Sequence, residues 1–581
     1  MQPVPWPEPD PVVAAAIRGM YGSRKTEPPL AVNVRDKMGE WLHDGDFAAA
    51  FGTRGRPGWS PSRLALVTVL QRAENLTDRM AAEQVRTRLD WKYLLGLALD
   101  DPGFDHTVLA EFRARVADAG LEQAALDALL ERLAADGLVK AGGKQRTDST
   151  HVVAAVAALN RLELAGESVR AAAEALAAAH PGWASQVLCA SGWARRYGAP
   201  LTDWHPPASK KKQDELAVTY ARDGYALLEA VYDKASPAWL AGLPAVDVLR
   251  RVLLQNYTRQ VRADGTEVVK RREKQPEGDG LPPGRYRIAS PYDADARWGA
   301  KRGEFWLGYK LHVTEACDGE PPCGCGGTAA RSGHAGDCAA PAFPNLVTHV
   351  ATTGAAVADN AMTSVIDDEL AAKGLAPGQH YLDSGYVSAS LAVSEAARHG
   401  IALIGPLLAD TSAQARAGNG YARADFAIDY DGKTVTCPQG KTSTSWSPCT
   451  QRGQDAVVAR FSTRDCGPCP ARELCTKGRY RQLTLQPRAL AEAQATARAA
   501  GSTSPFQADY ARRAGVEGTM HQAASHGARR TRYRGLTKTR LDHAFMALAL
   551  NLLRLHAYWN GTPLDRQRTS HLARLELHLA A

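Results

Sequence analysis

The order of strand and helix patterns between residues 144 and 404 most constrains the fold of this chain. Stretches rich in β-branched residues predict three strands in succession, followed by an alternation of helices and strands. The predicted elements are, in chain order, strand Lys144–Val153, strand Phe305–Thr314, strand Asn345–Thr353, helix Ala361–Lys373, strand His380–Tyr386, helix Ser388–His399 and strand Ile401–Ile404. This order predicts an α/β layer fold.

The first 140 residues carry helical patterns. Ser60-Pro61 predicts a helix start, because a capping serine precedes a first-turn proline. A second helix is predicted over Arg79–Leu89. Two short helices around a polar turn resemble a helix-turn-helix, which docks in the major groove of DNA, and a plain helix bundle is the alternative. We expect an N-terminal helical domain over residues 1–140, with DNA binding as its candidate role.

Two long insertions separate the predicted core elements. Residues 154–289 begin with alanine-rich helical sequence and end in a hairpin, Tyr257–Arg272, whose Asp264-Gly265 pair suits a type I′ turn. Residues 406–505 are rich in Cys, Thr, Ser and Gly. Helical patterns follow over Gln507–Ser525 and Thr537–His556. A chain of 581 residues is expected to form about two to four structural units, since domains usually contain about 100 to 200 residues.

The distribution of charge favours a polyanionic partner. The chain carries 70 Lys and Arg against 62 Asp and Glu, a net charge of +8. Within Gly501–Ala581 there are 12 basic and 5 acidic residues, within Arg250–Lys274 there are 8 and 3, and Lys210–Lys212 is a short basic run. Any one of these segments suits a solvated surface, but the three together favour a nucleic acid.

The composition is that of an ordinary folded protein. Hydrophobic residues make up 45% and charged residues 23% of the chain, which excludes a disordered acidic chain and a fibrous repeat. The first residues lack the basic and apolar regions of a signal peptide, and no apolar run reaches the roughly 18 residues of a membrane span. We expect a cytoplasmic protein with no membrane partner. In that reducing compartment, clustered cysteines are better explained as metal ligands than as disulfides or redox groups.

Two aspartates lie on predicted strands. Asp148 is in the middle of Lys144–Val153, and Asp383 lies within the pattern His380–Tyr386. A carboxylate in a buried strand costs several kcal/mol unless something neutralises it, and a bound cation would do so. For either residue alone, a helix cap or a turn is an equally good explanation.

A third acid belongs to a more specific pattern, Tyr510-x-x-Arg513-x-x-x-Glu517. Spacings of three and four place the three side chains along one face of the helix predicted over Gln507–Ser525. This pattern, downstream of two strand-borne aspartates, resembles the DDE transposases of bacterial insertion sequences. Further blocks resemble that family in the same order: Thr147-Asp148-Ser149-Thr150, Ser290–Arg297, Gly308–His312, Asp383–Tyr386 and Arg534-Gly535-Leu536.

The glutamate pattern departs from the family at one position and has two rivals. The family often continues with a lysine seven residues after the glutamate, where this chain has Ala524. Arg529 or Arg530 could take over that phosphate contact. Glu473 and Glu492 are the other candidates for the third acid, but neither completes the Tyr, Arg and Glu spacing.

The resemblance implies a ribonuclease-H-like core, a mixed sheet flanked by helices, over residues 141–405 and 506–581. Asp148 would lie on the first strand, Asp383 just past the fourth and Glu517 on a late helix. The three carboxylates would hold two Mg²⁺ (or Mn²⁺) ions, which suit oxygen ligands and phosphate substrates. Arg513 and Tyr510 would contact backbone phosphates.

The implied function is that of a DNA transposase. Such an enzyme binds the terminal inverted repeats of an insertion sequence, cleaves the ends by Mg²⁺-dependent hydrolysis, and joins the 3′-hydroxyl ends to target DNA. The implied partners are double-stranded DNA and a second copy of the chain in a synaptic homodimer, at the nucleoid, with no small-molecule substrate. Three alternatives stay open: a nuclease of similar fold without strand transfer, a domesticated DNA-binding protein without catalysis, and a zinc-stabilised scaffold.

The cysteines predict a structural zinc site within residues 406–505. The pattern C-x28-C-x2-C-x5-C contains a Cys-Gly-Pro-Cys turn, which is typical of one half of such a site. The predicted ligands are Cys437, Cys466, Cys469 and Cys475. Cys449 is a fifth candidate, and free thiols are the alternative. A second, less regular cluster could bind another zinc: Cys317, Cys323, Cys325 and Cys338, with His334.

Overall fold

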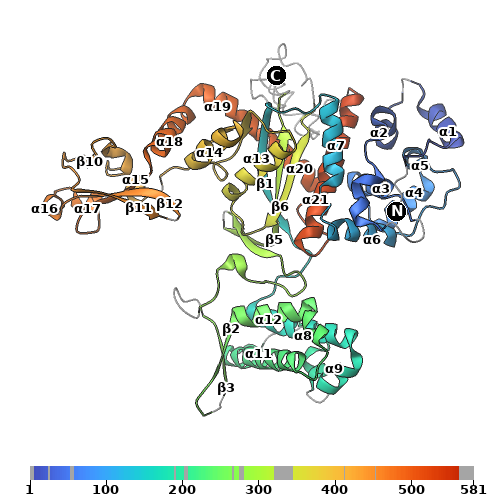
Figure 1. The fold of residues 1–581 in the computed structure, drawn as a ribbon, viewed down its shortest axis with the longest axis horizontal. Coiled ribbons are helices and arrows are strands. Elements are labelled where there is room, and N and C mark those ends of the chain that lie inside the picture. The colour runs from blue at the N-terminus through green and yellow to red at the C-terminus, as the bar shows by residue number, and fades with distance from the viewer. Residues whose placement is uncertain are drawn as a thin grey trace, which may run out of the picture.

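A six-stranded mixed sheet forms the centre of the molecule (Figure 1). The computed structural model describes residues 5–23, 26–52, 58–188, 192–201, 207–264, 267–273, 280–301, 303–318, 344–410, 412–451 and 453–561. The central strands are β1 (Lys144–Val153), β4 (Arg297–Lys301), β5 (Glu304–Ala316), β6 (Val347–Gly354), β7 (Gln379–Tyr381) and β8 (Ala402–Ile404). The helices packed with them are α13 (Thr363–Ala372) and α14 (Ala389–His399). The α/β fold predicted from the sequence is confirmed.

The strand order is β4-β5-β1-β7-β8, with β6 also paired to β5. β1 is antiparallel to β5, where Asp148 lies opposite Val313. On its other side β1 is parallel to β7, where Arg146 lies opposite Tyr381, and β7 is parallel to β8. Because β1 and β7 run in the same direction, the residues that follow the end of β7 at Tyr381 lie alongside the middle of β1, just after Arg146.

One predicted strand is shorter than expected. The pattern His380–Tyr386 predicts a strand through Tyr386, but β7 ends at Tyr381. The cause is a turn in which the Gly385 N–H donates to Asp383 Oδ1 at 2.8 Å and the Tyr386 N–H donates to the Asp383 carbonyl at 3.1 Å. These local hydrogen bonds take the place of the sheet ladder.

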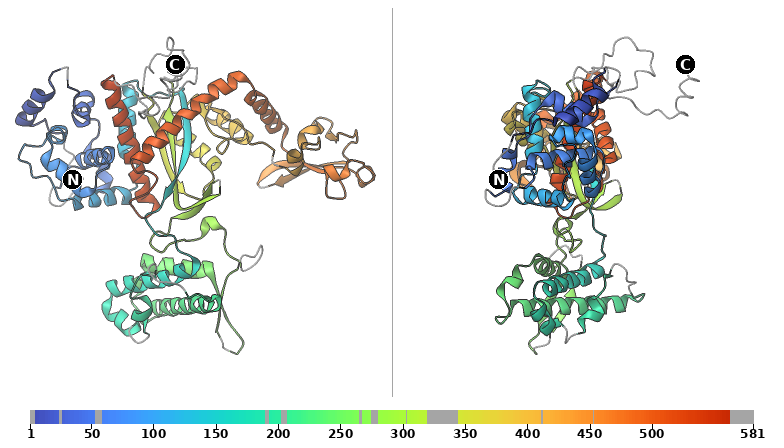
Figure 2. Two further views of the ribbon diagram at one scale, coloured as in Figure 1. Left: turned by 180° about the vertical axis from the view of Figure 1, so that it is seen from behind. Right: turned by 90° about the vertical axis from the view of Figure 1, so that its right-hand side faces the viewer.

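The N-terminal helices share one hydrophobic core with the sheet. The long helix α21 (Leu536–Trp559) lies between them and the sheet (Figure 2). A buried ion pair between Arg72 and Asp542 crosses this contact. The N-terminal elements are α1 (Pro11–Tyr21), α2 (Leu30–Met38), η1 (Asp44–Ala50), α3 (Pro61–Ala73), α4 (Asp78–Thr87), α5 (Leu89–Leu95), α6 (Thr107–Asp118) and α7 (Ala124–Ala135).

The helix pair predicted around residues 60–89 is present in a modified form. Ser60 caps α3, because its Oγ accepts a hydrogen bond from the Arg63 N–H. The second helix, predicted over Arg79–Leu89, corresponds to α4, which ends earlier, at Thr87. Every residue of α3 except Arg63 is buried, whereas α4 presents several exposed side chains. The part of this pair available to a partner is therefore α4.

The helices between β1 and β4 have a hydrophobic cluster of their own and are seen below the sheet in Figure 1. The hairpin predicted over Tyr257–Arg272 is confirmed as the antiparallel pair β2–β3; Gly265 of its predicted turn lies outside the described residues. The elements are α8 (Arg161–Ala179), α9 (Pro181–Leu188), α10 (Trp193–Tyr197), α11 (Lys210–Tyr232), η4 (Ala238–Gly242), α12 (Pro244–Asn256), β2 (Tyr257–Val261), β3 (Glu267–Arg271) and η5 (Gly284–Tyr286).

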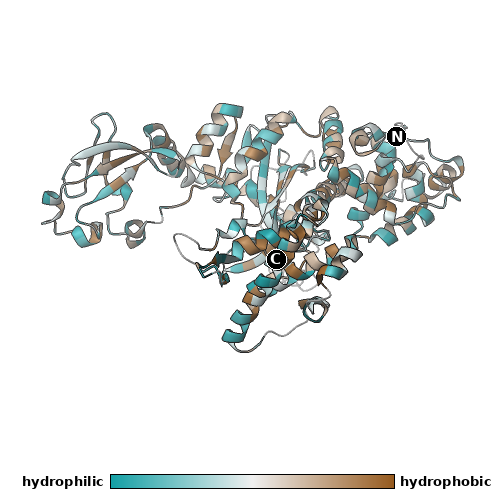
Figure 3. Ribbon diagram, turned by 60° about the horizontal axis from the view of Figure 1, so that its bottom comes forward, coloured by the Kyte–Doolittle hydropathy of each residue, from teal (hydrophilic) through white to brown (hydrophobic). Residues whose placement is uncertain are grey.

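The cysteine-rich segment forms an arm with a small hydrophobic cluster of its own. In Figure 3 the hydrophobic colouring gathers on the central helices, and this arm is largely teal and white. Its elements are α15 (Ala413–Ala417), η8 (Arg423–Asp425), β9 (Ala427–Asp429), β10 (Thr434–Thr436), β11 (Ser445–Gln451), β12 (Gln454–Arg460), α16 (Thr463–Cys466), α17 (Arg472–Cys475) and β13 (Gln482–Leu485). The domain boundaries stated above stay predictions. Among the described residues, no helix has the length and apolar character that a membrane crossing requires.

Candidate active site

Asp148 and Asp383 lie close to each other, where the carboxyl end of β7 meets the middle of β1. Each is two residues past a pair of opposed residues on the parallel strands β1 and β7, namely Arg146 and Tyr381. The Asp148 side chain is 13% exposed and that of Asp383 is 31% exposed. The Ser149 N–H donates to Asp148 Oδ1 at 2.7 Å, which fixes one oxygen of that carboxylate. The sheet topology thus explains why two acids 235 positions apart in sequence meet.

The third acid reaches the site on a segment with a break in it. The sequence predicts one helix over Gln507–Ser525, but the structure divides it into α19 (Ser504–Tyr510), the 3₁₀ turn η9 (Ala511–Ala514) and α20 (Gly515–Ser525). Tyr510, Arg513 and Glu517 therefore lie on three successive elements rather than on one regular helix. The buried Arg146 guanidinium holds this break against β1, because its Nη1 donates to the Arg512 carbonyl at 2.6 Å.

Arg513 stands among the three acids. Its Nη2 is 2.8 Å from Asp148 Oδ2 and 4.0 Å from Asp383 Oδ2. Its Nη1 is 3.3 Å from Glu517 Oε1. The structure thus brings together all three predicted catalytic acids and the predicted arginine around one position.

The charges at this position shift the acid–base properties of its side chains. Burial raises the pKa of Asp148, and the nearby charge of Asp383 raises it further against the opposing effect of Arg513. Burial alone would lower the pKa of Arg513, but the charges of the surrounding acids outweigh it and raise that pKa. The pKa of Tyr510 is also raised, first by burial and then by the same acids. The carboxyl group of Asp148 is thus harder to ionise, and the Arg513 cation is surrounded by three carboxylates. Such a site favours the binding of additional positive charge.

The donor set of the site fits divalent metal ions. Three carboxylates from β1, the end of β7 and α20 already converge on one cationic group, and hard ions such as Mg²⁺ prefer oxygen ligands of this kind. A second group of acidic and histidine side chains lies elsewhere. Among the described residues, it is the one group of three or more possible metal ligands whose ligand atoms all lie within 4.8 Å of one another, and it consists of Asp368, Glu395 and His399. Arg398 pairs with Asp368 at 2.5 Å and with Glu395 at 3.4 Å, so that cluster has its own cation.

A fourth carboxylate borders the site and was not predicted from the sequence. Asp359 follows β6 and accepts hydrogen bonds at its Oδ1 from Lys310 Nζ at 2.9 Å and from Ser149 Oγ at 3.2 Å. It begins the 3₁₀ turn η7 (Asp359–Ala361), five residues past the end of β6 and outside any predicted strand. Lys310 belongs to the block Gly308–His312, one of the segments whose sequence resembles the DDE transposases.

The basic residues and rival acids occupy distinct places. Arg529 and Arg530 are exposed and run beside the end of β1, where the Val153 N–H donates to the Arg529 carbonyl at 2.8 Å. Arg529 Nε also donates to Thr150 Oγ1 at 3.2 Å. The rival acids lie in the cysteine-rich arm and on α18 (Arg488–Gly501): Glu473 is part of α17, and Glu492 pairs with Arg488 at 2.7 Å.

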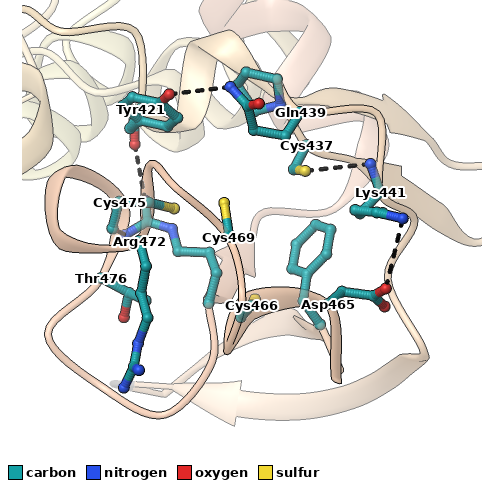
Figure 4. Close-up of a pocket in the computed structure, with 13 residues that line it drawn as sticks. Tyr421, Cys437, Gln439, Lys441, Asp465, Cys466, Cys469, Arg472, Cys475 and Thr476 are labelled. Carbon is teal, nitrogen blue, oxygen red and sulfur yellow. Dashed lines mark hydrogen bonds and ion pairs between the residues drawn. The ribbon is translucent and has the colours of Figure 1, made fainter. Parts of the chain in front are cut away.

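The four predicted zinc ligands line one small pocket of the arm (Figure 4). The pocket has a volume of about 30 Å³, and it contains Cys437, Cys466, Cys469 and Cys475. Burial raises the pKa of the Cys475 thiol, and the other three thiols raise it further. Of the described residues, no three cysteine sulfur atoms lie within 4.8 Å of one another. The four cysteines therefore share one pocket, but their sulfur atoms are not arranged as a tetrahedral metal site.

The remaining cysteines are not part of this pocket. Cys449 lies on β11 opposite Ala456. Of the second predicted cluster only Cys317 is described, and it is buried. Cys323, Cys325, His334 and Cys338 lie outside the described residues.

The fold and the site define a class, an α/β protein with three carboxylates gathered beside a mixed sheet. Residues 436–556 match the family model described as transposase DDE domain, and residues 25–115 match the one described as transposase domain (DUF772). Together the two matches indicate a DDE transposase of the insertion-sequence type. The first match includes Glu517 and the four pocket cysteines, whereas Asp148 and Asp383 lie before it. No curated protein and no solved structure matches the chain.

Proposed function

We propose that the protein binds the terminal inverted repeats of an insertion sequence, cleaves the DNA ends with a divalent metal, and joins the 3′-hydroxyl ends to target DNA. The observation that carries this proposal is the convergence of Asp148, Asp383 and Glu517 on Arg513. β7 is the fifth strand of the sheet in chain order, because β4 pairs with β5 as an additional strand. With β4 left out, the strand order supports a ribonuclease-H-like core in which Asp148 is on the first strand and Asp383 lies just past the fourth.

Asp148, Asp383 and Glu517 would hold two Mg²⁺ or Mn²⁺ ions. Bound there, such ions activate a hydroxyl nucleophile and stabilise the leaving oxygen of an in-line phosphoryl displacement. Arg513 lies within reach of the same position and would pair with a DNA phosphate, with the Tyr510 hydroxyl beside it. The exposed Arg529 and Arg530 would hold the backbone next to the end of β1.

Other parts of the chain have proposed roles in this scheme. Residues 1–140 would bind DNA, and residues 154–289 are an insertion in the core made of 141–405 and 506–581. Residues 406–505 would bind one structural Zn²⁺ through Cys437, Cys466, Cys469 and Cys475, which line one pocket. Because two ends must be joined to one target, the working unit would be at least a homodimer at the nucleoid.

Cleavage of a labelled duplex from the DNA that flanks the gene tests the proposal. With Mg²⁺ or Mn²⁺, the wild-type protein should nick this duplex at a discrete end. Asp148→Asn, Asp383→Asn and Glu517→Gln should each abolish nicking and keep DNA binding. Glu473→Gln and Glu492→Gln are matched controls, because they remove the rival acids, and both should cut normally.

The products separate transposition from its alternatives. Joining of the cut 3′ end to a second plasmid identifies a transposase, whereas cutting without joining identifies a nuclease. Binding without any cutting by the wild-type protein would mean that catalysis has lapsed. If Glu517→Gln still cuts and Glu473→Gln or Glu492→Gln does not, the assignment of the third acid is wrong.

A further inference from the structure

A polar cleft of about 400 Å³ lies between the cysteine-rich arm and helix α18. Four segments line it: the chain after β8, the start of η8, the start of β13, and one face of α18. The lining residues are Leu408, Ala409, Asp410, Ser412, Arg423, Arg481, Gln482, Leu483, Thr484, Gln494 and Arg498. A cavity of this size is in the range that holds a small ligand or part of a larger one.

Three arginines from separate segments meet in this cleft, and their hydrogen-bond partners are neutral. Arg423 Nη2 donates to Gln494 Oε1 at 2.8 Å, and Arg498 Nη2 donates to the Leu408 carbonyl at 3.1 Å. Arg481 donates to two backbone carbonyls of the arm, at 2.9 and 3.3 Å. Its Nε is buried and has no hydrogen-bond acceptor among the described residues.

The positive charge of the cleft is only partly balanced. Within the described part of the chain, no carboxylate lies within 4.0 Å of these three guanidinium groups, whereas many other arginines of the chain are ion-paired. Asp410 is the single acid in the lining. Its pKa is lowered, first by the Ser412 N–H and further by the charges of Arg423 and Arg498. Three arginines against one aspartate leave a net positive site that suits an anion.

We propose that the cleft lined by Arg423, Arg481 and Arg498 binds the sugar-phosphate backbone of the DNA substrate, outside the catalytic site. Guanidinium groups recognise phosphate through paired N–H donors. The remaining polar lining, Gln482, Thr484 and Gln494, adds neutral donors of the kind that contact DNA phosphates. The described lining contains no aromatic residue on which a base could stack. The contact would therefore position the duplex without reading its sequence.

The connection between the cleft and the acids supports a DNA occupant. Arg498 lies on α18, which leads through α19 to Arg513. The two arginines are 15 positions apart along a mostly helical segment that breaks after Gly501 and at η9, so the path along the chain is about 22 Å at roughly 1.5 Å per residue. One turn of duplex DNA spans about 34 Å. A single DNA segment is thus long enough to contact both the cleft and the catalytic acids.

The inference rests on the proposed function, because DNA is the substrate named there. The test measures binding of a fluorescent duplex from the flanking DNA to the full-length protein, without divalent metal, over a series of KCl concentrations. The association constant K falls with salt, and each lost phosphate contact lowers the magnitude of the negative slope of log K against log[salt] by about 0.9. Arg498→Gln should lower it by about 0.9 and raise the Kd several-fold. The double variant Arg423→Gln/Arg498→Gln should lower it by about 1.8.

Arg488→Gln is the matched control, since Arg488 is on the same helix but is ion-paired with Glu492 at 2.7 Å and with Asp431 at 2.8 Å. It should keep the wild-type slope. Arg481 is left unchanged in these variants, because its bonds to backbone carbonyls help to hold the arm together. Thermal melting confirms that each variant is folded.

The outcomes distinguish this inference from the proposed function. An unchanged slope and Kd in the double variant, with normal binding by the wild-type protein, overturns the cleft assignment and leaves the transposase proposal standing. No DNA binding by the wild-type protein overturns both. Pyrophosphate is the probe for a free anion: if it binds in a manner that requires Arg423 and Arg498 and DNA does not displace it, the cleft belongs to a small phosphate ligand and the DNA assignment is wrong.

Discussion

Replacing Glu315 by glutamine tests how the helix that carries Glu517 is held against the sheet. Glu315 lies on β5 and is fully buried. Its Oε1 accepts a hydrogen bond from Arg146 Nε at 2.7 Å, and its Oε2 accepts one from Arg554 Nη1 at 2.7 Å. Thr519 on α20 donates to the same carboxylate. The Glu315 carboxylate thus pairs with two buried guanidinium groups and joins β1, β5, α20 and α21.

Glutamine keeps the shape of this side chain but removes its charge. Both Arg146 and Arg554 would then lose a buried counterion, and breaking a buried ion pair from one side costs about 3–5 kcal/mol. We therefore expect Glu315→Gln to lower the free energy of unfolding at pH 7 by about 3–5 kcal/mol, which corresponds to a fall in Tm of a few degrees for a cooperative unit of this size.

The effect should depend on pH with a defined sign. Burial would raise the pKa of Glu315, but the charges of Arg146 and Arg554, with the hydrogen bonds to the carboxylate, hold it below its ordinary value of 4.5. Because the folded pKa is lower than the unfolded one, this stabilisation is fully present above about pH 4.5 and is lost as the pH falls through the folded pKa. The difference in Tm between the two proteins should therefore narrow in acid.

Calorimetry on the full chain measures both effects. Glu111→Gln is the control, because Glu111 is exposed and lies 3.8 Å from Arg115, and such surface pairs contribute at most about 1 kcal/mol. If Glu315→Gln at pH 7 melts at the same temperature as Glu111→Gln, the buried triad does not hold α20 in place and the reasoning fails.

Two further predictions concern the catalytic segment and the arm. Gly515→Ala should destabilise the protein by about 1–3 kcal/mol, because a Cβ there would collide with the buried Arg146 guanidinium. Gly518→Ala on the same helix has free space and should stabilise it by up to about 1 kcal/mol; equal melting curves for the two variants would contradict the contact. Chelator-washed wild-type protein should contain one zinc per chain by elemental analysis. Cys466→Ser should lose that zinc and Cys449→Ser should keep it, whereas a wild-type protein without zinc would exclude the site.

Much of the sheet and the pairing of two acids could be predicted from the sequence. The strand Lys144–Val153 has the predicted bounds, because a run of β-branched residues between turns specifies a strand locally. The proximity of Asp148 and Asp383 follows once their strands are known to be parallel neighbours. The convergence of Glu517 on them was expected only through the family resemblance, and it depends on how α20 packs on β1.

The rest depends on contacts between distant positions. The break at Ala511–Ala514 accompanies the bond from Arg146 to the Arg512 carbonyl, which no local pattern encodes. Asp359 begins η7 outside the predicted strands, and only the packed structure shows its pair with Lys310. The cleft of Arg423, Arg481 and Arg498 likewise comes from three segments whose proximity is set by the fold of the arm.

The position of α21 has a consequence for synthesis of the protein. Residues 536–559 fill the space between the N-terminal helices and the sheet, so neither side can bury its apolar face until the ribosome has made them. At about 5–20 residues per second, the apolar face of α3 waits roughly 25–100 s for its partner. During that interval the nascent chain exposes the surfaces that chaperones recognise, and shortened products that lack α21 should aggregate. The core can therefore close only after α21 has been synthesised.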